Sequence, residues 1–400
     1  MLPPISEELG LSIPSIGGWM YSSLKRLVVN SQDSYGVATI WEGKELKEYN
    51  INNVTYYLLP LNGKISTEYN SHLEKYWRMI KASFKPDIIH IHGTEYPHGL
   101  AYVNSCGSNG VVVSIQGIIS CIAKYYTAGI TNASIKKNIT LRDLLKGGII
   151  SQQKSFEKRG KYEIQLIKSV KHIIGRTEWD KAHIWSLNPL ANYYHVGETL
   201  RDSFYGNKWR YGLCEPHSIF ISQASYPIKG FHKFLEALPL VLKCFPDTKV
   251  YVAGADIHNQ PWYRIGTYAN YIKHLILKWN LNDVVKFVGN LNEEQMSQQY
   301  LKSNLFICCS AIENSPNSLG EAQVLGVPHL ASFVGGIPEI VNYNSNVLYR
   351  FEETEMLAKK ICDIFGKGDN IDIPTYDMNM YDGNSNLEAL RTVYKQIYKD

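Results

Sequence analysis

Two glutamates in the second half of the chain, Glu313 and Glu321, stand eight positions apart in a setting suited to ligand binding. Glu313 follows an apolar run, residues 305–309, which predicts a buried strand, and Glu321 lies in a predicted helix that begins near residue 317. In doubly wound α/β sheets, ligands bind beyond the carboxyl ends of the strands and face helix N-termini. The pattern therefore places both carboxylates near a ligand, although ordinary surface and helix-dipole charges would give the same spacing.

The predicted helix start supplies hydrogen-bond donors for an anion. Backbone N–H groups in the first turn of a helix lack partners within that helix, and they carry the positive end of its dipole. We expect the amides of Asn317, Ser318 and Leu319 to bind the phosphates of a diphosphate in this way. Glu313 can then approach a sugar carried by the diphosphate, and Glu321 can accept hydrogen bonds from ribose hydroxyls.

Polar side chains also follow predicted strands in the first half of the chain. One predicted strand covers residues 87–91 and another covers residues 111–117. We expect four residues at the ends of these two strands, or in the loop after the first of them, to line a cleft, although a structural role is the alternative for each: His92, Glu95, His98 and Gln116. His90 shares a strand face with His92, but no compact set of carboxylates and no D-x-D motif accompanies them. No metal site is therefore expected.

The segment from residue 305 to residue 341 resembles the donor-binding segment of retaining GT-B glycosyltransferases, specifically glycosyltransferase family 4 (glycosyl transferases group 1). Glu313 and Glu321 match the E-x7-E signature of that family. The Gly-Val-Pro strand and the G-G-x-P-E loop that follow the signature stand here at residues 326–328 and 335–339. Several linked matches in the same order are more specific than any one of them, so the resemblance implies that Glu313 positions a transferred sugar.

The resemblance extends upstream over almost the whole chain. The sequence SQASYPIKGF, residues 222–231, is similar to the family's phosphate loop, which implies that Lys229 contacts the donor diphosphate. Ala224 stands where the family commonly has arginine, so this loop has one cation fewer. Arg201 is our candidate for the replacement, because a guanidinium can bind phosphate through two hydrogen bonds. A position on the surface or at a domain interface is the alternative for Arg201.

Further segments in the first half match the same family. His92 corresponds to the second histidine of an H-x-H-G segment, which implies a position near the transferred sugar. Gly17 and Gly18 resemble the first glycine loop, where the backbone approaches the ligand closely. The segments SIQG and GRTEWD are similar to parts of bacterial polysaccharide-building members, and they make Arg176 a secondary candidate.

The elements that must position these residues alternate along the chain as strand and helix. Short β-branched runs separated by amphipathic stretches predict βαβ units and parallel sheets. Predicted strands cover residues 36–41, 54–60, 87–93, 111–117, 172–176, 192–196, 218–222, 249–254, 285–289, 305–309, 328–331 and 346–349. Predicted helices include residues 67–84, 141–157, 229–244 and 293–303. The fold class is therefore α/β, with two doubly wound Rossmann-like domains, and the resemblance implies a GT-B fold with an interdomain cleft.

A chain of 400 residues exceeds the usual size of one α/β core, so we expect two domains. An acceptor-side domain is expected over residues 1–203 and a nucleotide-sugar-binding domain over residues 204–380, followed by a C-terminal helix over residues 381–400 that packs back on the first domain. The weakly periodic stretch 201–216 marks the boundary. No apolar strand precedes Gly17, so either the chain start is truncated, which we favour, or the first sheet lacks its central strand.

Composition is that of an ordinary soluble globular protein, with 44% apolar and 20% charged residues. Seven cysteines, an odd number without any C-x-x-C pair, argue against a disulfide framework or a zinc site and fit a reducing cytoplasm. The sequence contains no apolar run of membrane-spanning length and no secretory signal pattern. We expect a cytoplasmic protein that needs no cofactor.

Positive charge is concentrated in the first half of the chain. Residues 1–200 carry 22 basic and 16 acidic residues, whereas residues 201–400 carry 19 and 21. The stretch 124–171 alone contains 11 basic and 3 acidic residues, interleaved with aromatic and aliphatic ones. It is either a solvated helical face or a peripheral contact with anionic lipid headgroups at the inner face of a membrane. A nucleic-acid recognition module is not recognisable, so no nucleic-acid partner is expected.

The expected activity is retaining, metal-independent transfer of a hexose-type sugar from a nucleotide-diphosphate donor. The acceptor would be a glycan or a lipid-linked molecule in cell-surface polysaccharide synthesis. Glu313, His92 and Lys229 are the expected catalytic residues. Two alternatives remain open, namely a sugar-nucleotide epimerase of the same architecture and a non-catalytic sugar-nucleotide-binding subunit, which Ala224 and the missing strand favour.

Overall fold

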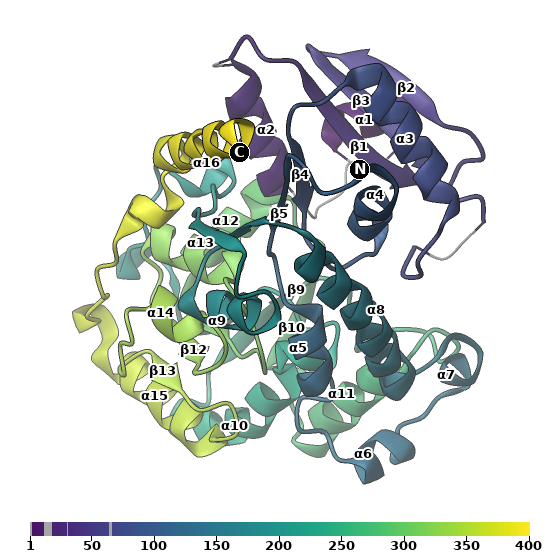
Figure 1. Cartoon of the computed structure of the whole chain (residues 1–400). Coiled ribbons are helices and arrows are strands. Elements are labelled where there is room, and N and C mark those ends of the chain that lie inside the picture. The colour runs from purple at the N-terminus through teal and green to yellow at the C-terminus, as the bar shows by residue number, and fades with distance from the viewer. Residues whose placement is uncertain (1, 12–17, 30, 64–65) are drawn as a thin grey trace. The chain divides into compact units, whose positions relative to one another are not determined.

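The computed structural model describes residues 2–11, 18–29, 31–63 and 66–400. The chain forms two compact α/β units whose elements are labelled in Figure 1. Unit 1 contains residues 1–121, 155–201 and 379–400, and unit 2 contains residues 122–154 and 202–378. Each unit contains a parallel sheet, as the alternation of strands and helices predicts, and unit 1 also contains a mixed sheet in which β2 (Lys47–Ile51) pairs antiparallel with β3 (Val54–Pro60).

Unit 2 is built on one six-stranded sheet with the strand order β10-β9-β8-β11-β12-β13, and every strand pair in it is parallel. The strands are β8 (Glu215–Ile221), β9 (Lys249–Ala253), β10 (Val285–Gly289), β11 (Ser303–Cys308), β12 (His329–Ser332) and β13 (Leu348–Tyr349). This is the doubly wound order in which the chain leaves β8 in one direction and returns to β11 on its other side. A ligand site is therefore expected beyond the carboxyl ends of β8 and β11.

The helices of unit 2 connect these strands. They are α10 (Phe231–Cys244), α11 (Thr267–Lys278), α12 (Glu293–Lys302), α13 (Asn317–Leu325), α14 (Ile337–Ile340) and α15 (Thr354–Lys367). Short 3₁₀ turns cover Asp202–Phe204, Tyr211–Leu213, Pro227–Lys229 and Gly368–Asn370, and another covers Met378–Tyr381 at the boundary with unit 1. All six residues of β11 are buried, including the polar Ser303 and Asn304 at its start, as is typical of a central strand of a parallel sheet.

Unit 1 contains two separate sheets. One has the order β1-β3-β2 and comprises β1 (Tyr35–Trp41), β2 (Lys47–Ile51) and β3 (Val54–Pro60). The other is parallel, has the order β4-β5-β6-β7, and comprises β4 (Ile89–His92), β5 (Val111–Ser114), β6 (His172–Gly175) and β7 (Asn192–His195). The single doubly wound sheet expected for the first domain is therefore divided in two.

The described elements before β1 are helices. Residues 3–8 and 18–29 form the helices α1 (Pro3–Glu8) and α2 (Gly18–Val29), and no strand precedes β1 among the residues that the structure describes. Among the described residues, β4 pairs with β5 alone, and β1 pairs with β3 alone. Gly17 lies outside the described residues, and Gly18 is the first residue of α2.

The remaining helices of unit 1 are α3 (His72–Phe84), α4 (His98–Cys106), α5 (Ile119–Ile122), α8 (Ile149–Ser169), α9 (Glu178–Leu187) and α16 (Gly383–Lys399), of which α5 and α8 extend across a unit boundary. α3 lies against the sheet of β1 to β3 (Figure 1). Leu73 and Ile80 of α3 belong to one buried cluster with Tyr57 of β3. Successive side chains of a strand point to opposite faces, so β5 and β6 supply apolar residues to two cores.

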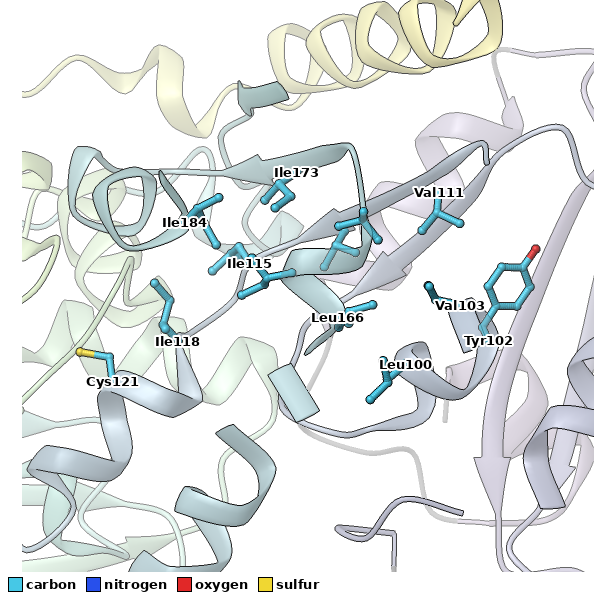
Figure 2. Packing of buried hydrophobic residues seen from close by; sticks show 13 residues of the cluster. Leu100, Tyr102, Val103, Val111, Ile115, Ile118, Cys121, Leu166, Ile173 and Ile184 are labelled. Atoms are coloured by element: carbon cyan, nitrogen blue, oxygen red, sulfur yellow. The ribbon is translucent and has the colours of Figure 1, made fainter. Parts of the chain in front are cut away.

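The two faces of the four-stranded sheet bury different clusters. Figure 2 shows one cluster, to which the sheet contributes Val111, Ile115 and Ile173, and the helices α4, α8 and α9 contribute Leu100, Val103, Leu166 and Ile184. Val112 and Ile174 point to the other face, where they pack against α16 through Leu387, Leu390, Val393 and Ile397. The C-terminal helix thus belongs to the core of unit 1.

The segment 122–154 belongs to unit 2, although the expected first domain, residues 1–203, included it. Its helices are α6 (Asn132–Lys137) and α7 (Leu141–Lys146), preceded by a 3₁₀ turn at Ala123–Tyr125. Polar contacts fix it there, because its backbone and buried side chains bond to α10 and α11 instead of to unit 1. The basic stretch 124–171 is consequently divided between the two units.

Candidate functional site

Lys229 and Glu313 meet at the carboxyl edge of the unit 2 sheet. Lys229 ends the loop that follows β8, and Glu313 lies in the loop that follows β11. Lys229 Nζ donates to Glu313 Oε1 at 2.5 Å. Because β8 and β11 are the two strands where the winding direction reverses, this ion pair occupies the position where doubly wound sheets bind ligands.

Neighbouring groups keep this ion pair charged and ordered. Burial disfavours the ammonium, but the Glu313 carboxylate and the Tyr226 hydroxyl outweigh that effect and raise the pKa of Lys229. Ser310 Oγ donates to the same Glu313 Oε1 at 2.8 Å. Lys229 is therefore a permanent cation at physiological pH, and the Glu313 carboxylate is held by two donors.

Two glycines allow the surrounding loops to approach the backbone of these residues. Gly335 has a φ of +54°, and a Cβ at this position would lie 1.8 Å from the carbonyl oxygen of Glu313. The next amide, of Gly336, donates to that same oxygen at 3.1 Å. Gly230, with a φ of +68°, is equally close to the carbonyl oxygen of Cys309. The G-G-x-P-E loop, residues 335–339, thus packs directly on the backbone of Glu313.

The first turn of α13 supplies fewer donors than the sequence indicates. α13 begins at Asn317, after Pro316, and Asn317 and Ser318 are partly exposed. The amide of Leu319 already donates to the carbonyl oxygen of Pro316 at 3.0 Å. The Leu319 amide therefore has a partner within the helix, contrary to the expectation of an unpaired donor, because an i→i−3 bond tightens the first turn of α13. Asn317 and Ser318 remain the candidates for binding an anion.

Three other predicted donor-side positions have different surroundings. Glu321 lies in the second turn of α13 and is only 6% exposed. Ala224 is buried beside the loop that carries Lys229 and supplies no charge. Arg201 is the last residue of its stretch of unit 1, whereas Lys229 belongs to unit 2, so the replacement of the missing arginine by Arg201 stays a prediction.

A second group of polar side chains gathers at the carboxyl ends of the unit 1 strands. Arg176, immediately after β6, forms an ion pair with Glu198 at 2.5 Å, and both residues are buried. Arg176 also donates to Gln116 Oε1 at 3.0 Å. With His92, the pair of Arg176 and Glu198 lines a cavity of about 50 Å³. Arg176 thus contacts Gln116 and shares the cavity lining with His92, and the roles expected for Gln116 and His92 stay predictions.

His92 is supported by its neighbour on the same strand face. The rings of His90 and His92 stack with their centroids 3.8 Å apart. His90 Nδ1 lies 2.7 Å from Tyr394 Oη of α16, and its Nε2 lies 2.5 Å from Ser114 Oγ. Burial, together with the charge of Arg176, lowers the pKa of His92 to about 4, so His92 is neutral at pH 7.

Glu95 and His98 lie in the loop after β4 and at the start of α4. Glu95 folds back over Gly93, since one of its carboxylate oxygens lies 2.1 Å from where a Gly93 Cβ would be. Burial raises the pKa of Glu95, and the nearby Glu163 adds to this effect. Burial lowers the pKa of His98 to about 4, and its Nδ1 has no hydrogen-bond partner among the described residues.

Sequence reasoning missed Ser310 and Glu198 and gave Arg176 little weight. Each of them stands directly after a strand or a few residues beyond one, which is the position that identified His92 and Glu313. A position just after a strand is therefore an informative signal for site residues. Ser310 and Glu198 were missed because neither belongs to a recognisable sequence motif. Within the described ranges, no group of three His, Cys, Asp or Glu side chains is arranged to hold a metal ion.

Comparison with known families identifies the segment that carries the Lys229–Glu313 pair. Residues 211–369 match the family model described as Glycosyl transferases group 1. Among curated proteins, spore coat protein SA of Bacillus subtilis (strain 168) is 27% identical over 155 residues, which are 38% of this chain and 40% of that protein. The match thus spans about two fifths of this curated relative's length.

Solved structures resemble the chain over most of its length. Sucrose-phosphate synthase from Thermosynechococcus elongatus has a TM-score of 0.59 and 14% identity, covering 91% of this chain and 85% of that one. Anabaena HepE in complex with UDP-glucose has a TM-score of 0.55 and 16% identity, covering 81% and 82%. These are GT-B glycosyltransferase structures, and the expected GT-B fold is confirmed.

Proposed function

We propose that the protein transfers a hexose-type sugar from a nucleotide-diphosphate donor to an acceptor, with retention of anomeric configuration and without a metal. The observation that carries this proposal is the contact of Lys229 with Glu313 at the carboxyl edge of the doubly wound sheet, inside the segment that matches Glycosyl transferases group 1. The UDP-glucose bound to HepE, a protein of the same fold, supports a nucleotide sugar as the donor.

In this proposal the donor diphosphate lies between the Lys229 ammonium and the first turn of α13. Breaking the bond between the anomeric carbon and the diphosphate leaves negative charge on the phosphate oxygen. Lys229 and the amides of Asn317 and Ser318 stabilise that charge as it develops. Because Glu313 already neutralises Lys229 in the free protein, the amides supply the main electrostatic gain for binding, and Lys229 acts more strongly as the leaving group forms.

Glu313 acts on the sugar. Ser310 and Lys229 fix one of its oxygens, so the carboxylate has a defined orientation toward the donor. We propose that it binds a sugar hydroxyl and stabilises the oxocarbenium-like transition state. The acceptor oxygen bonds to the anomeric carbon on the face that the diphosphate leaves, and the departing phosphate oxygen takes the acceptor proton.

The acceptor-side proposal concerns the group at the carboxyl ends of β4 to β7. His92 is neutral, so it can donate a hydrogen bond to a sugar hydroxyl or accept one from it. Gln116 and Glu95 are proposed to contact the sugar or the acceptor. The acceptor is proposed to be a glycan or a lipid-linked molecule of cell-surface polysaccharide synthesis.

The test is incubation of the purified protein with radiolabelled UDP-, GDP- and ADP-sugars, with and without a panel of glycan and lipid-linked acceptors. Transfer to an acceptor, or slow hydrolysis of one donor without it, is expected, and the anomeric configuration of the product reports retention. Added EDTA is expected to leave the rate unchanged. Isomerisation of the labelled sugar would assign an epimerase instead, and binding without turnover would assign a non-catalytic subunit.

A further inference from the structure

The segment that joins unit 2 from the middle of the chain presents exposed leucines. Leu141, Leu144 and Leu145 of α7 are 62%, 75% and 87% exposed. Three large aliphatic side chains in so short a helix are unusual for a water-facing surface, since burying apolar side chains stabilises a protein or a complex. The exposed side of α7 is therefore an apolar surface without a covering element among the described residues.

The backbone that carries these leucines is firmly held. Asp143, between the leucines, is buried and accepts from Thr267 Oγ1 at 2.6 Å. Thr140 donates to the carbonyl oxygen of Ile265 at 2.8 Å, and Asn138 Oδ1 lies 2.5 Å from His274 Nδ1. Thr140 and Asp143 also form a capping box that fixes the start of α7. Residues 138–143 are thus held against α11 and the residue that precedes it by two positions, Ile265. The three leucines lie on the opposite, exposed side of α7.

Positive charge surrounds the leucines. Residues 122–154 contain six lysine or arginine residues and one acidic residue, and that acidic residue is the buried Asp143. Lys136 and Lys137 at the end of α6, and Lys146 at the end of α7, are exposed. An exposed surface that mixes long aliphatic side chains with lysines, and has no exposed acid, complements a negatively charged apolar boundary.

We propose that the α6–α7 surface, formed by Leu141, Leu144, Leu145, Lys136, Lys137 and Lys146, docks on an anionic lipid bilayer. The leucines insert among the acyl chains near the headgroups, and the lysines contact the lipid phosphates. No helix within the described parts of the chain combines the length and apolar character needed to cross a bilayer, so the contact is peripheral.

The same segment reaches the candidate donor site inside unit 2. Ala128 packs against Ala311 and Phe351, and Ala311 precedes Glu313 by two residues. The carbonyl oxygen of Ala128 also accepts from His232 of α10 at 2.9 Å. A bilayer bound at the α6–α7 surface would therefore be linked through one short segment to the Glu313 loop. If the proposed transfer activity holds, this arrangement favours a membrane-borne, lipid-linked acceptor.

Vesicle flotation tests the docking without any donor or acceptor. Full-length protein is mixed with phosphatidylcholine vesicles, or with vesicles of which about one-third is phosphatidylglycerol, at low and at high salt. Binding to the anionic vesicles alone, weakened by salt, is expected. The double variant Leu144→Ser with Leu145→Ser is expected to weaken it at least tenfold. The triple variant Lys136→Gln, Lys137→Gln and Lys146→Gln is expected to weaken it about a hundredfold.

Control variants at other positions test whether vesicle binding depends on the α6–α7 surface itself or only on the total number of exposed leucines and lysines. Leu190→Ser with Leu213→Ser removes two leucines that are 88% and 74% exposed, and Lys243→Gln, Lys302→Gln and Lys367→Gln removes the same charge from exposed positions. Both controls should bind vesicles like the unaltered protein. Equal binding by all variants, or no preference for anionic vesicles, would overturn the proposal. So would a dimer in solution that the Leu144 and Leu145 double variant disrupts, because the leucines would then bind a second copy of this chain.

Discussion

Lys229 and Ser310 converge on the same carboxylate oxygen, Oε1 of Glu313, from two loops that are far apart in sequence. The ammonium and the hydroxyl leave the other oxygen of Glu313 to be used by a ligand. The two groups therefore have different proposed roles. The Ser310 hydroxyl orients the carboxylate, whereas the Lys229 ammonium both orients it and supplies positive charge. Four predictions test the arrangement and its surroundings.

Glu313→Gln should lower turnover by at least a hundredfold and leave nucleotide-diphosphate affinity within a few fold. The amide keeps the shape of the side chain but cannot stabilise positive charge on the sugar. Initial rates with a radiolabelled donor, and titration calorimetry with the free nucleotide diphosphate, give the two values. Glu352→Gln, at an exposed position of the same unit, is the matched control. Unchanged turnover in Glu313→Gln would remove the role assigned to this carboxylate.

Gly335→Ala should damage both stability and activity, whereas Gly326→Ala should affect stability alone. Both glycines have positive φ, +54° and +72°, so each alanine costs about 1 kcal/mol of backbone strain. At Gly335 the new Cβ also meets the Glu313 carbonyl, whereas nothing lies within 4 Å at Gly326. Thermal unfolding and donor turnover of both variants check this. Equal activity in the two variants would show that the Gly335 loop does not position Glu313.

Arg176→Met should destabilise the protein by about 3 to 5 kcal/mol, because it leaves the buried Glu198 carboxylate without its counter-charge. Adding Glu198→Met should restore most of the loss, since two apolar side chains replace the ion pair. Urea unfolding of the two variants measures the difference. If the double variant were less stable than Arg176→Met, the interaction of the pair would not be the source of the effect.

Stability should fall as the pH drops from about 6.5 to about 4, and His329 should contribute. Burial lowers the pKa of His329 to about 4, from 6.5 in an unfolded chain. The unfolded state therefore takes up a proton first, and roughly 3 kcal/mol of stabilisation, complete above pH 6.5, is lost on the way down. His329→Asn keeps the donor to the Val327 carbonyl and lacks the titrating ring.

Urea unfolding at several pH values compares the His329→Asn variant with the unaltered protein. The variant should lose less stability than the unaltered protein between pH 7 and pH 4. Because other buried histidines have lowered pKa values too, the variant is expected to keep part of the dependence. Parallel pH profiles for the two proteins would contradict the assignment to His329.

Many of the strands were predictable because a run of β-branched and aromatic residues that ends at a turn residue indicates a strand. The predicted strands 54–60 and 285–289 coincide with β3 and β10, since both are rich in β-branched and aromatic residues and end at proline or glycine. β2, residues 47–51, was missed because it is an edge strand of polar residues paired on one side. The helix predicted over residues 141–157 is interrupted at Gly147, whose φ of +79° ends α7.

The candidate site was predictable where a residue followed a strand and carried a motif. Lys229, Glu313 and His92 meet both conditions, and the structure brings Lys229 and Glu313 together. The membership of residues 122–154 in unit 2 was not predictable, because it depends on contacts such as that of Asp143 with Thr267, which are distant in sequence. Local periodicity carries no information about which core a helix joins.

The interleaved order of the chain has a consequence for synthesis. The core on one face of the unit 1 sheet needs Leu387, Leu390, Val393 and Ile397, which are synthesised long after the strands β4 to β7 of that sheet. Unit 2, in turn, includes residues 122–154, which emerge long before its own first strand. Unit 1 therefore cannot complete this core before α16 has been translated, by which time all residues of unit 2, 122–154 and 202–378, have already been made.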